Sequence, residues 1–461
     1  MEIALLVLYG LLLVWSGLGP LWRGGAGDGS GDGSGSGPGR TPAPGRLGRG
    51  ALAFFVNNRA AGPLAVGFSI IVSCVGASAT IGMIGLAFTV GTPAFWWLGS
   101  GAAGLVLLSF VLAGKVRESG AYTLPHMAES LLGLSARPAM SLLIVLAWTA
   151  ILAAQFVALG RVLGPLTGLG PEACLAVGML LIGLHTLGGQ AAIMRADRVQ
   201  ALVLVACLAA MLCWVSSRNP GWSRAVSPEA VNDAFPASDF LYYLVIVGAN
   251  YVVCPMLFGR MLSARDACSA RLGGLVGAAG IMLCAGLIVA VGLACRGLVA
   301  PGTGPDDVLP AILAGGMPDW MRLVVSFALI SAIVSSADSC LVTAATVLSF
   351  DLLGRRDAGT GRFCVIGLGL AGALVSLTGK GILGYLLMAY DVFACGVVVP
   401  VFVGLILHGK RRLNGRWSLA AVLVGGGLGL IAAVSGNTLF SYAGMMAALL
   451  LSAGGALRGT D

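Results

Sequence analysis

The sequence predicts an all-α integral membrane protein with about 13 transmembrane helices. Of its 461 residues, 58% are hydrophobic and only 10% are charged, and the mean hydropathy is +0.95. A water-soluble domain carries roughly a quarter charged residues, so this composition excludes one. The apolar residues also fall into runs of about 18 or more, which is the length that crosses a bilayer as a helix.

Taken in chain order, these runs define the expected helices. They cover residues 3–22, 63–91, 94–114, 138–160, 172–188, 190–217, 237–259, 273–295, 322–350, 363–379, 382–407, 417–435 and 438–457. The first run has no basic residues before it, which favours a retained helix over 1–22; a cleaved signal peptide is the alternative, because Gly/Ser-rich sequence follows. Residues 23–62 are rich in Gly, Ser and Arg, which predicts a flexible cytoplasmic linker.

The basic residues lie in short loops and divide unequally between the two sides of the membrane. With the N-terminus outside, 21 Lys and Arg fall on the cytoplasmic side, among them Arg260, Arg265 and Arg271, and 6 fall outside. This asymmetry predicts an inner (plasma) membrane protein with a cytoplasmic C-terminus. It also explains the net charge of +8 without nucleic-acid binding. The 11 cysteines show no paired spacing, so we expect neither disulfides nor a zinc site.

Two of the expected helices contain interruptions. The 63–91 run has small and hydroxyl residues at its middle, from Ser73 to Gly82. The 237–259 run contains Pro255, which removes a backbone donor and bends or breaks a helix. Each interruption opens a unit of five spans, 63–217 and 237–407, and residues 408–461 add two further helices. Interrupted segments at matching positions in two halves are typical of an inverted-repeat transporter.

One span carries a column of oxygens at membrane depth. At about 100° per residue, its Ser and Thr side chains share one arc of the helix, and an aspartate flanks them. The residues are Ser335, Ser336, Ser339, Thr343, Thr346 and Asp338. A polar face of this kind inside a membrane either packs closely against a neighbouring helix or lines a hydrated ion path, and the sequence leaves both alternatives open.

Three carboxylates lie well inside apolar segments, where charge is costly. Asp197 either pairs with Arg195 or Arg198 or serves an ion path. Asp391 either contacts a solute or bridges helices. Asp338, on the oxygen-rich helix, is the strongest functional candidate. A monovalent cation is well served by hydroxyl and backbone carbonyl oxygens, and the interrupted 63–91 segment would supply the carbonyls.

Several motifs resemble those of the sodium:solute symporters, the family of proline, pantothenate, sialic acid and sodium/glucose carriers. The stretch from Ala332 to Asp351 resembles the family's eighth core helix. Four further stretches agree in order: Phe55–Pro63 with "GGR…GP", Tyr122–Pro125 with "YTLP", Gly188–Gln200 with "GG…TDxxQ", and Pro255–Ala264 with "P…RxLxA".

The resemblance implies a leucine-transporter-like core of five plus five helices. It implies a sodium ion bound by the backbone oxygens of Val72, Val75 and Ala332 and the hydroxyls of Ser335 and Ser336. Some members bind a second sodium ion, whose matching positions here are Asp197, Ser335, Asp338 and Ser339.

The solute is expected near the helix interruptions. The residues that would line its site are Gly76, Ala77, Ser78, Ala79, Gln155, Asn250, Tyr251, Tyr390 and Asp391. The resemblance also disfavours two known solutes. Cys74 replaces the acidic residue of proline carriers, and Ala79 aligns with a glutamine of sugar carriers. Trp96 and Trp97 near a span end are expected to anchor at the membrane interface.

We therefore expect a sodium-coupled symporter that imports a small organic solute by alternating access, acts as a monomer in the lipid bilayer, and has no enzymatic activity. A solute sensor that signals through a partner is the alternative. No cofactor other than Na⁺, and no nucleic-acid partner, is expected.

Overall fold

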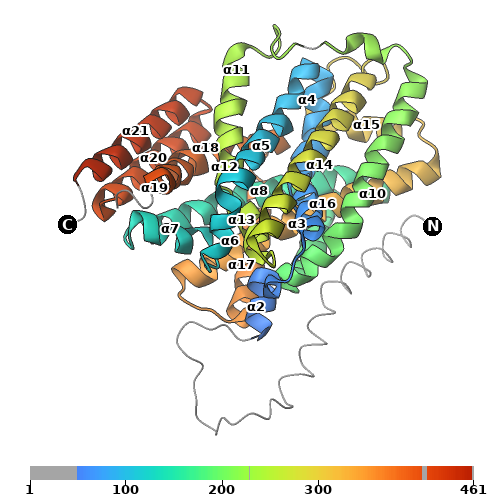
Figure 1. Ribbon diagram of the computed structural model, residues 1–461. Coiled ribbons are helices and arrows are strands. Elements are labelled where there is room, and N and C mark those ends of the chain that lie inside the picture. Colours follow the sequence, from blue (N-terminus) through green and yellow to red (C-terminus); the bar gives the residue numbers. More distant parts are fainter. Residues whose placement is uncertain (1–48, 228, 408–412, 459–461) are drawn as a thin grey trace, which may run out of the picture.

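A computed structural model describes residues 49–227, 229–407 and 413–458, and within these ranges all regular elements are helices (Figure 1). The expected span over 3–22 and most of the linker lie outside the described residues. The final part of the expected linker is helical: α2 (Arg49–Val56) is followed by the short turn η1 (Asn57–Arg59). An apolar stretch that includes the buried Phe54 and Phe55 explains this helix, because it packs onto the bundle.

The first half of the bundle runs from Pro63 to Arg218. Its elements are α3 (Pro63–Cys74), η2 (Ser78–Gly82), α4 (Met83–Val90), η3 (Thr92–Phe95), α5 (Trp96–Leu107), η4 (Leu108–Leu112), α6 (Ala113–Glu118), α7 (Leu124–Leu132), α8 (Ala136–Thr167), α9 (Pro171–Thr186) and α10 (Gly189–Arg218).

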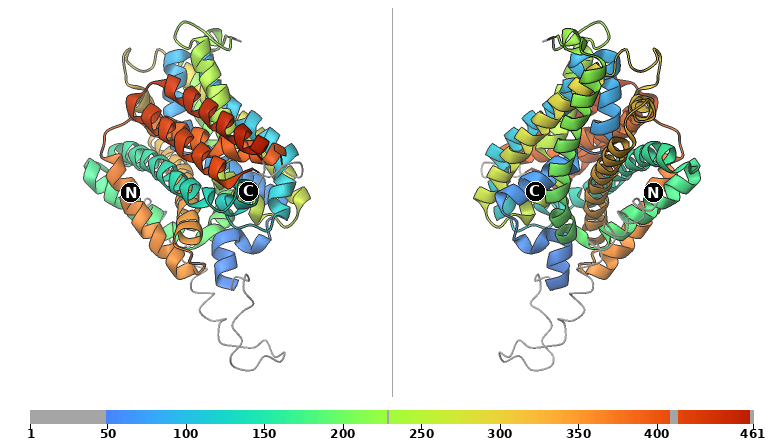
Figure 2. Two further views of the ribbon diagram at one scale, coloured as in Figure 1. Left: turned by 90° about the vertical axis from the view of Figure 1, so that its left-hand side faces the viewer. Right: turned by 90° about the vertical axis from the view of Figure 1, so that its right-hand side faces the viewer.

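The second half follows the short turn η5 (Trp222–Ala225). Its elements are α11 (Ala237–Tyr242), η6 (Tyr243–Val247), α12 (Gly248–Val252), α13 (Pro255–Ser263), α14 (Ala267–Ala294), η7 (Pro305–Asp307), α15 (Val308–Ala314), α16 (Asp319–Val347), η8 (Leu348–Leu352), α17 (Ala358–Ser376), α18 (Ile382–Phe393), η9 (Ala394–Val398) and α19 (Val399–Leu407). Two more helices, α20 (Gly415–Ser435) and α21 (Thr438–Arg458), pack along each other on one flank of the bundle (Figure 1, Figure 2).

The interruption expected in the first core span is present. α3 ends at Cys74, and the chain resumes as a helix at Ser78 with a bend of 59°. Val75 leaves the helical region, with φ −97° and ψ 58°. A bend of this kind leaves backbone carbonyls without helical partners, which is tolerated inside a membrane protein only where other groups satisfy them.

The second interruption is milder. Val253 leaves helical geometry (φ −126°, ψ 64°) and Pro255 begins α13 at a position where a missing N–H costs nothing. Residues Ala237–Ser263 nevertheless run on as one span. Pro255 therefore interrupts the hydrogen bonding of this span without the sharp bend seen after Cys74.

Within the described residues, each of the twelve expected spans that can be compared coincides with helix. Ten helices are long and apolar enough to cross a bilayer, and the bent pair α3–α4 adds an eleventh. Helix α9 is apolar but has only 16 residues. The count of 13 is therefore not confirmed, although the all-helical membrane fold is.

Small residues allow α3 to approach α14 closely. Gly273 and Gly277 of α14 face Val66 and Ile70 of α3, and a Cβ atom on either glycine would overlap those side chains. This is the spacing of four by which helices pack closely in membranes. Helix α3 also contacts α10 and α16.

The backbone of the turn η1 explains the residues found in the stretch that resembles the "GGR" motif. Asn57, Asn58 and Arg59 all have positive φ, between 48° and 55°. Asn57 and Asn58 occupy the place of the two glycines in the "GGR" motif, and asparagine tolerates this backbone better than other residues with a Cβ atom. Arg59 is then directed to the carbonyl of Gly120, at 2.8 Å.

We predict that replacing the exposed Asn58 by glycine leaves stability unchanged or raises it. Asn58→Val should lower the free energy of unfolding by about 1–2 kcal/mol, because a β-branched residue is strained at positive φ. Thermal unfolding of the purified variants measures the difference. Equal stability of the valine and glycine variants would contradict the left-handed turn.

Candidate functional site

The oxygen-rich face of α16 lies against the end of α3. Ser336 Oγ donates to the backbone carbonyl of Ser73 at 3.0 Å. The hydroxyls of Ser73 and Ser339 are 2.8 Å apart. A Cβ atom on Gly76 would overlap the Ser336 side chain, so glycine at this break allows the two helices to meet.

The residues expected to bind sodium are all buried at this contact: Val72, Val75, Ala332, Ser335 and Ser336. The bend after Cys74 makes backbone carbonyl oxygens available, the Ser336 hydroxyl donates to the carbonyl of Ser73 there, and the neighbouring Ser335 hydroxyl donates to Asp197. Carbonyl and hydroxyl oxygens are suitable ligands for a hard monovalent cation that must bind and leave. The donor set therefore fits Na⁺.

Asp197 of α10 joins the same contact from a third helix. It is fully buried, and its carboxylate accepts hydrogen bonds from Ser69 of α3 and from Ser335 of α16, the latter at 2.6 Å. The ion pair expected with Arg195 or Arg198 does not account for these two contacts, which Asp197 makes with hydroxyls of other helices. Asp197 instead orients one of the two hydroxyls expected at the sodium site.

Arg260 of α13 is the arginine of the "P…RxLxA" stretch, but the sequence assigned it no role at this site. We counted it among loop arginines, but its side chain is completely buried. Nη2 donates to the hydroxyls of Ser73, at 2.9 Å, and Ser339, and lies 3.8 Å from Asp197 Oδ2. Because α13 begins at Pro255, the Arg260 side chain reaches both Ser73 of α3 and Ser339 of α16.

Asp338 faces a different neighbour. One carboxylate oxygen is paired with His185 Nδ1 and the other accepts from Thr186 Oγ1 at 2.6 Å. Both partners belong to the end of α9. Asp338 therefore ties α16 to α9, whereas Asp197, Ser335 and Ser339 gather on the side of α3.

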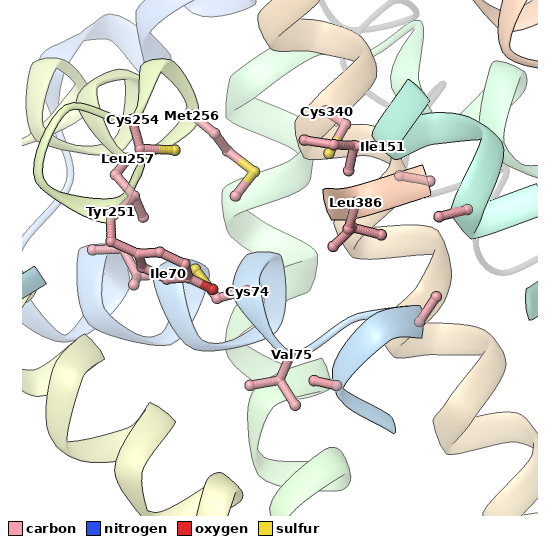
Figure 3. Packing of buried hydrophobic residues seen from close by; sticks show 14 of the residues in the cluster. Ile70, Cys74, Val75, Ile151, Tyr251, Cys254, Met256, Leu257, Cys340 and Leu386 are labelled. Carbon is pink, nitrogen blue, oxygen red and sulfur yellow. The ribbon is translucent and has the colours of Figure 1, made fainter. Parts of the chain in front are cut away.

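A small cavity of about 40 Å³ adjoins the break in α3. Residues from α3, η2, α8, α12, the break before α13, α13, α16 and α18 line it: Ser73, Cys74, Ser78, Trp148, Ile151, Gln155, Asn250, Tyr251, Cys254, Met256, Ser336, Cys340, Leu386 and Tyr390. Figure 3 shows Cys74 beside Tyr251, with Ile151, Cys340 and Leu386 on the opposite side of this space. Ligand pockets usually measure about 300–1,000 Å³, so this cavity would have to widen before it could hold a small solute.

The lining combines polar groups with aromatic and sulfur-containing side chains. Trp148 Nε1 and Asn250 Oδ1 are buried without hydrogen-bond partners within the described residues. Gln155 Oε1 accepts from the backbone N–H of Ala77 at 3.1 Å. Buried polar groups normally have partners, so Trp148 and Asn250 offer one donor and one acceptor to a ligand.

The expected solute residues divide into two groups. Ser78, Gln155, Asn250, Tyr251 and Tyr390 line the cavity, whereas Gly76, Ala77, Ala79 and Asp391 do not. Asp391 Oδ1 accepts from Tyr242 and Ser441, both at 2.7 Å. It therefore bridges helices, which was the alternative interpretation of this residue.

Trp97 belongs to an aromatic cluster, not to a membrane interface. It is 2% exposed, and its ring lies 5.5 Å from Tyr243 and 6.1 Å from Tyr390. The bend between α4 and α5 turns this tryptophan inward. Since Tyr390 also lines the cavity, the cluster covers one side of it.

Comparison with known proteins agrees with this architecture. The model of the sodium:solute symporter family matches residues 54–425. No curated protein matches the sequence.

Solved structures of Na⁺-coupled and related transporters share the fold. A Na⁺-coupled sialic acid symporter, in a substrate-bound outward-open state with a novel Na⁺ site, superposes with a TM-score of 0.78 at 15% identity, over 99% of this chain and 98% of the other. Mhp1, a nucleobase-cation-symport-1 family transporter with bromovinylhydantoin bound, gives 0.61 at 15% identity, over 89% and 95%. MhsT in complex with L-phenylalanine gives 0.60 at 17%, over 85% and 98%.

The contacts of Asp338 predict a structural role for its carboxylate. Asp338→Leu should lower the free energy of unfolding by about 3 kcal/mol, because it leaves buried polar partners on α9 unpaired. Thr186→Val, which removes one hydrogen bond, should cost about 1 kcal/mol. Thermal unfolding over a range of NaCl concentrations measures both effects. A tenfold change in the Na⁺ requirement of Asp338→Asn would instead make Asp338 a sodium ligand.

Proposed function

Because this chain belongs to the sodium:solute symporter family, we propose that it imports a small organic solute together with Na⁺ by alternating access. Its fold is leucine-transporter-like, as in the Na⁺-coupled transporters that superpose on it. The observation that carries the proposal is the contact between the interrupted helix α3 and the hydroxyls of α16. That contact combines backbone carbonyl oxygens at the break, two serine hydroxyls and the buried carboxylate of Asp197.

In this mechanism, Na⁺ from outside binds between Val72, Val75 and Ala332 carbonyls and the Ser335 and Ser336 hydroxyls. Val72 and Val75 belong to the end of α3 and the other three ligands to α16, so binding favours the state in which α3 and α16 are close. The ion thereby stabilises the conformation that binds solute, and release of the ion on the cytoplasmic side favours solute release.

The solute site we propose is the cavity beside the same break. Its lining has no charged side chain, and Asp391 is engaged elsewhere. The groups it offers are the Trp148 N–H, the Asn250 carbonyl oxygen, the Gln155 amide and two tyrosine rings. We therefore propose a small solute without net positive charge that presents adjacent hydrogen-bond donors and acceptors.

A thermal-unfolding screen in NaCl tests this solute class. Amides, ureides and nucleobases should stabilise the protein, and this gain should be lost in Asn250→Leu. Cationic amines of the same size serve as controls and should have no effect. Stabilisation by amines alone would contradict the proposed chemistry.

We also propose that the chain acts as a monomer in the plasma membrane, with its N-terminus outside and its C-terminus in the cytoplasm. The end of the bundle that contains α2 carries Arg59, Arg117 and Arg265. Arginines concentrated at one end support a cytoplasmic location for that end.

The sodium site predicts the effect of removing both hydroxyls. Ser335→Ala combined with Ser336→Ala should raise the Na⁺ concentration required for half-maximal uptake at least tenfold, which corresponds to about 1.4 kcal/mol. Solute counterflow in proteoliposomes, or stabilisation by NaCl, measures this requirement. Choline chloride at equal ionic strength controls for nonspecific salt effects.

A matched control lies on the same helix. Thr346 belongs to the same column of oxygens, but its hydroxyl donates to the carbonyl of Val342 in its own helix. Thr346→Val should therefore leave the Na⁺ requirement unchanged. An unchanged requirement in the double serine variant would contradict the proposed site.

A further inference from the structure

We propose that the groove between the ends of α8, α9 and α17 binds one phospholipid whose headgroup carries a primary ammonium, as phosphatidylethanolamine does. Arg161 holds the phosphate, Asp307 holds the ammonium, and an acyl chain fills the groove. The inference goes beyond the proposed transport function. It takes from the proposed orientation only that this end of the bundle faces the outer leaflet.

The groove lies beyond two points at which these helices pack closely. A Cβ atom on Gly178 of α9 would lie 2.8 Å from the Leu159 side chain of α8. A Cβ atom on Gly372 of α17 would lie 2.8 Å from the Leu152 side chain of α8. On Gly160 of α8, by contrast, a Cβ atom would meet nothing within 4 Å. The helices thus leave a groove of about 460 Å³ here, within the range usual for ligand sites.

The groove faces the hydrocarbon layer of the membrane. Leu374 and Leu377 at the end of α17 are exposed, and α8 and α17 are both long and apolar enough to cross a bilayer. Water finds few partners in an apolar groove, and an empty groove forfeits dispersion contacts, so hydrocarbon fills it. On α8 the groove covers only Phe156 to Gly164, which is too short for a transmembrane helix of about 20 residues. An acyl chain is the occupant that fits.

One polar side chain of the lining is directed to the rim and can bind a ligand. Ser376 Oγ already donates to the carbonyl of Ala373 at 2.6 Å, and Cys174 Sγ donates to the carbonyl of Leu169 at 3.6 Å. The third polar side chain of the lining is Arg161, which is 46% exposed. A ligand that matches this lining combines an apolar chain with an anionic group. Phosphate is the group that a guanidinium binds best, so the lining matches a phospholipid.

Asp307 determines which headgroup fits. Its carboxylate is 47% exposed and pairs with Arg161 Nη1, so Nε and Nη2 of the same guanidinium can bind a phosphate while this ion pair persists. Glu172 in the first turn of α9 is also exposed, which adds a second carboxylate at this end of the helices. Two carboxylates disfavour a headgroup with net negative charge. A primary ammonium donates hydrogen bonds to a carboxylate, whereas the quaternary ammonium of choline has no N–H to donate.

The groove is well placed to affect transport. Trp148 and Gln155 line the solute cavity from one face of α8. Val157 and Gly160 line the groove from the opposite face of the same helix. A bound acyl chain therefore supports the helix that separates the groove from the cavity.

Lipid retention tests the inference. The purified full-length chain is reconstituted in nanodiscs that contain equal amounts of phosphatidylethanolamine, phosphatidylcholine and phosphatidylglycerol, and native mass spectrometry identifies the lipid that stays bound. One phosphatidylethanolamine should be retained, enriched about threefold over each of the other two lipids, because an exposed charge pair contributes modestly.

Gly160→Leu fills the groove and should lower retention of this lipid by about threefold or more, to the level of the other two lipids. Gly367→Leu is the matched control. Its Cβ atom would also meet nothing within 4 Å, and it lies on the exposed face of α17 outside the groove. It should retain lipid as the wild type does.

Asp307→Asn tests the headgroup. Loss of the carboxylate leaves Arg161 without its ion pair, so the preference should change from phosphatidylethanolamine to the anionic phosphatidylglycerol. Asp319→Asn is the control, because it removes a carboxylate from another exposed ion pair, with Arg322 at 3.0 Å. It should leave the preference unchanged.

Each result decides the inference. Equal retention of the three lipids by the wild type, or unchanged retention in Gly160→Leu, would overturn it. If no lipid is retained, a protein segment of this chain or of a second copy fills the groove, which would also overturn it. If Gly160→Leu does not fold, Asp307→Asn decides: a change of preference supports the inference and an unchanged preference overturns it. Sodium-coupled transport stands under all of these outcomes.

Discussion

The contact between the bent end of α3 and the hydroxyl face of α16 determines how the rest of this protein is arranged. A membrane helix that bends by 59° exposes carbonyl groups that lipid cannot satisfy, and each buried unpaired group costs about 1–3 kcal/mol. α16 supplies the compensating oxygens and donors. Ser336 bonds to the carbonyl of Ser73, and Gly76 leaves room for this approach. The bend and the serines therefore depend on each other.

The buried charged side chains beside this contact are also paired with one another. Asp197 lies behind Ser335, Arg260 lies beside Asp197, and Asp338 is paired with His185. Asp197 and Asp338 thus each have a nitrogen-bearing partner, whereas the buried Asp391 accepts from two hydroxyls. The cavity itself is left without charged side chains, so recognition of a solute there rests on amide, indole and phenol groups.

Local sequence signals were sufficient for part of this arrangement. The 100° periodicity of α16 identified the buried hydroxyl face, and the small residues after Ser73 located the bend. The sequence could not indicate which helices these faces would meet. Arg260 looks like a loop residue because it follows a span; only the new direction of the chain after Pro255 brings it beneath α3. For the same reason the sequence did not indicate the buried position of Trp97 and left two roles open for Asp391, since their neighbours Tyr243 and Ser441 are distant in the sequence.

Hydrogen–deuterium exchange of the purified chain in NaCl, compared with KCl at equal concentration, tests the central contact most directly. If Na⁺ joins α3 to α16, sodium should slow exchange in peptides that cover residues 70–82 and in those that cover 330–340, because the ion binds backbone oxygens of both segments. Unchanged exchange in both segments, with protection confined to other helices, would show that the cation binds elsewhere and would contradict the account.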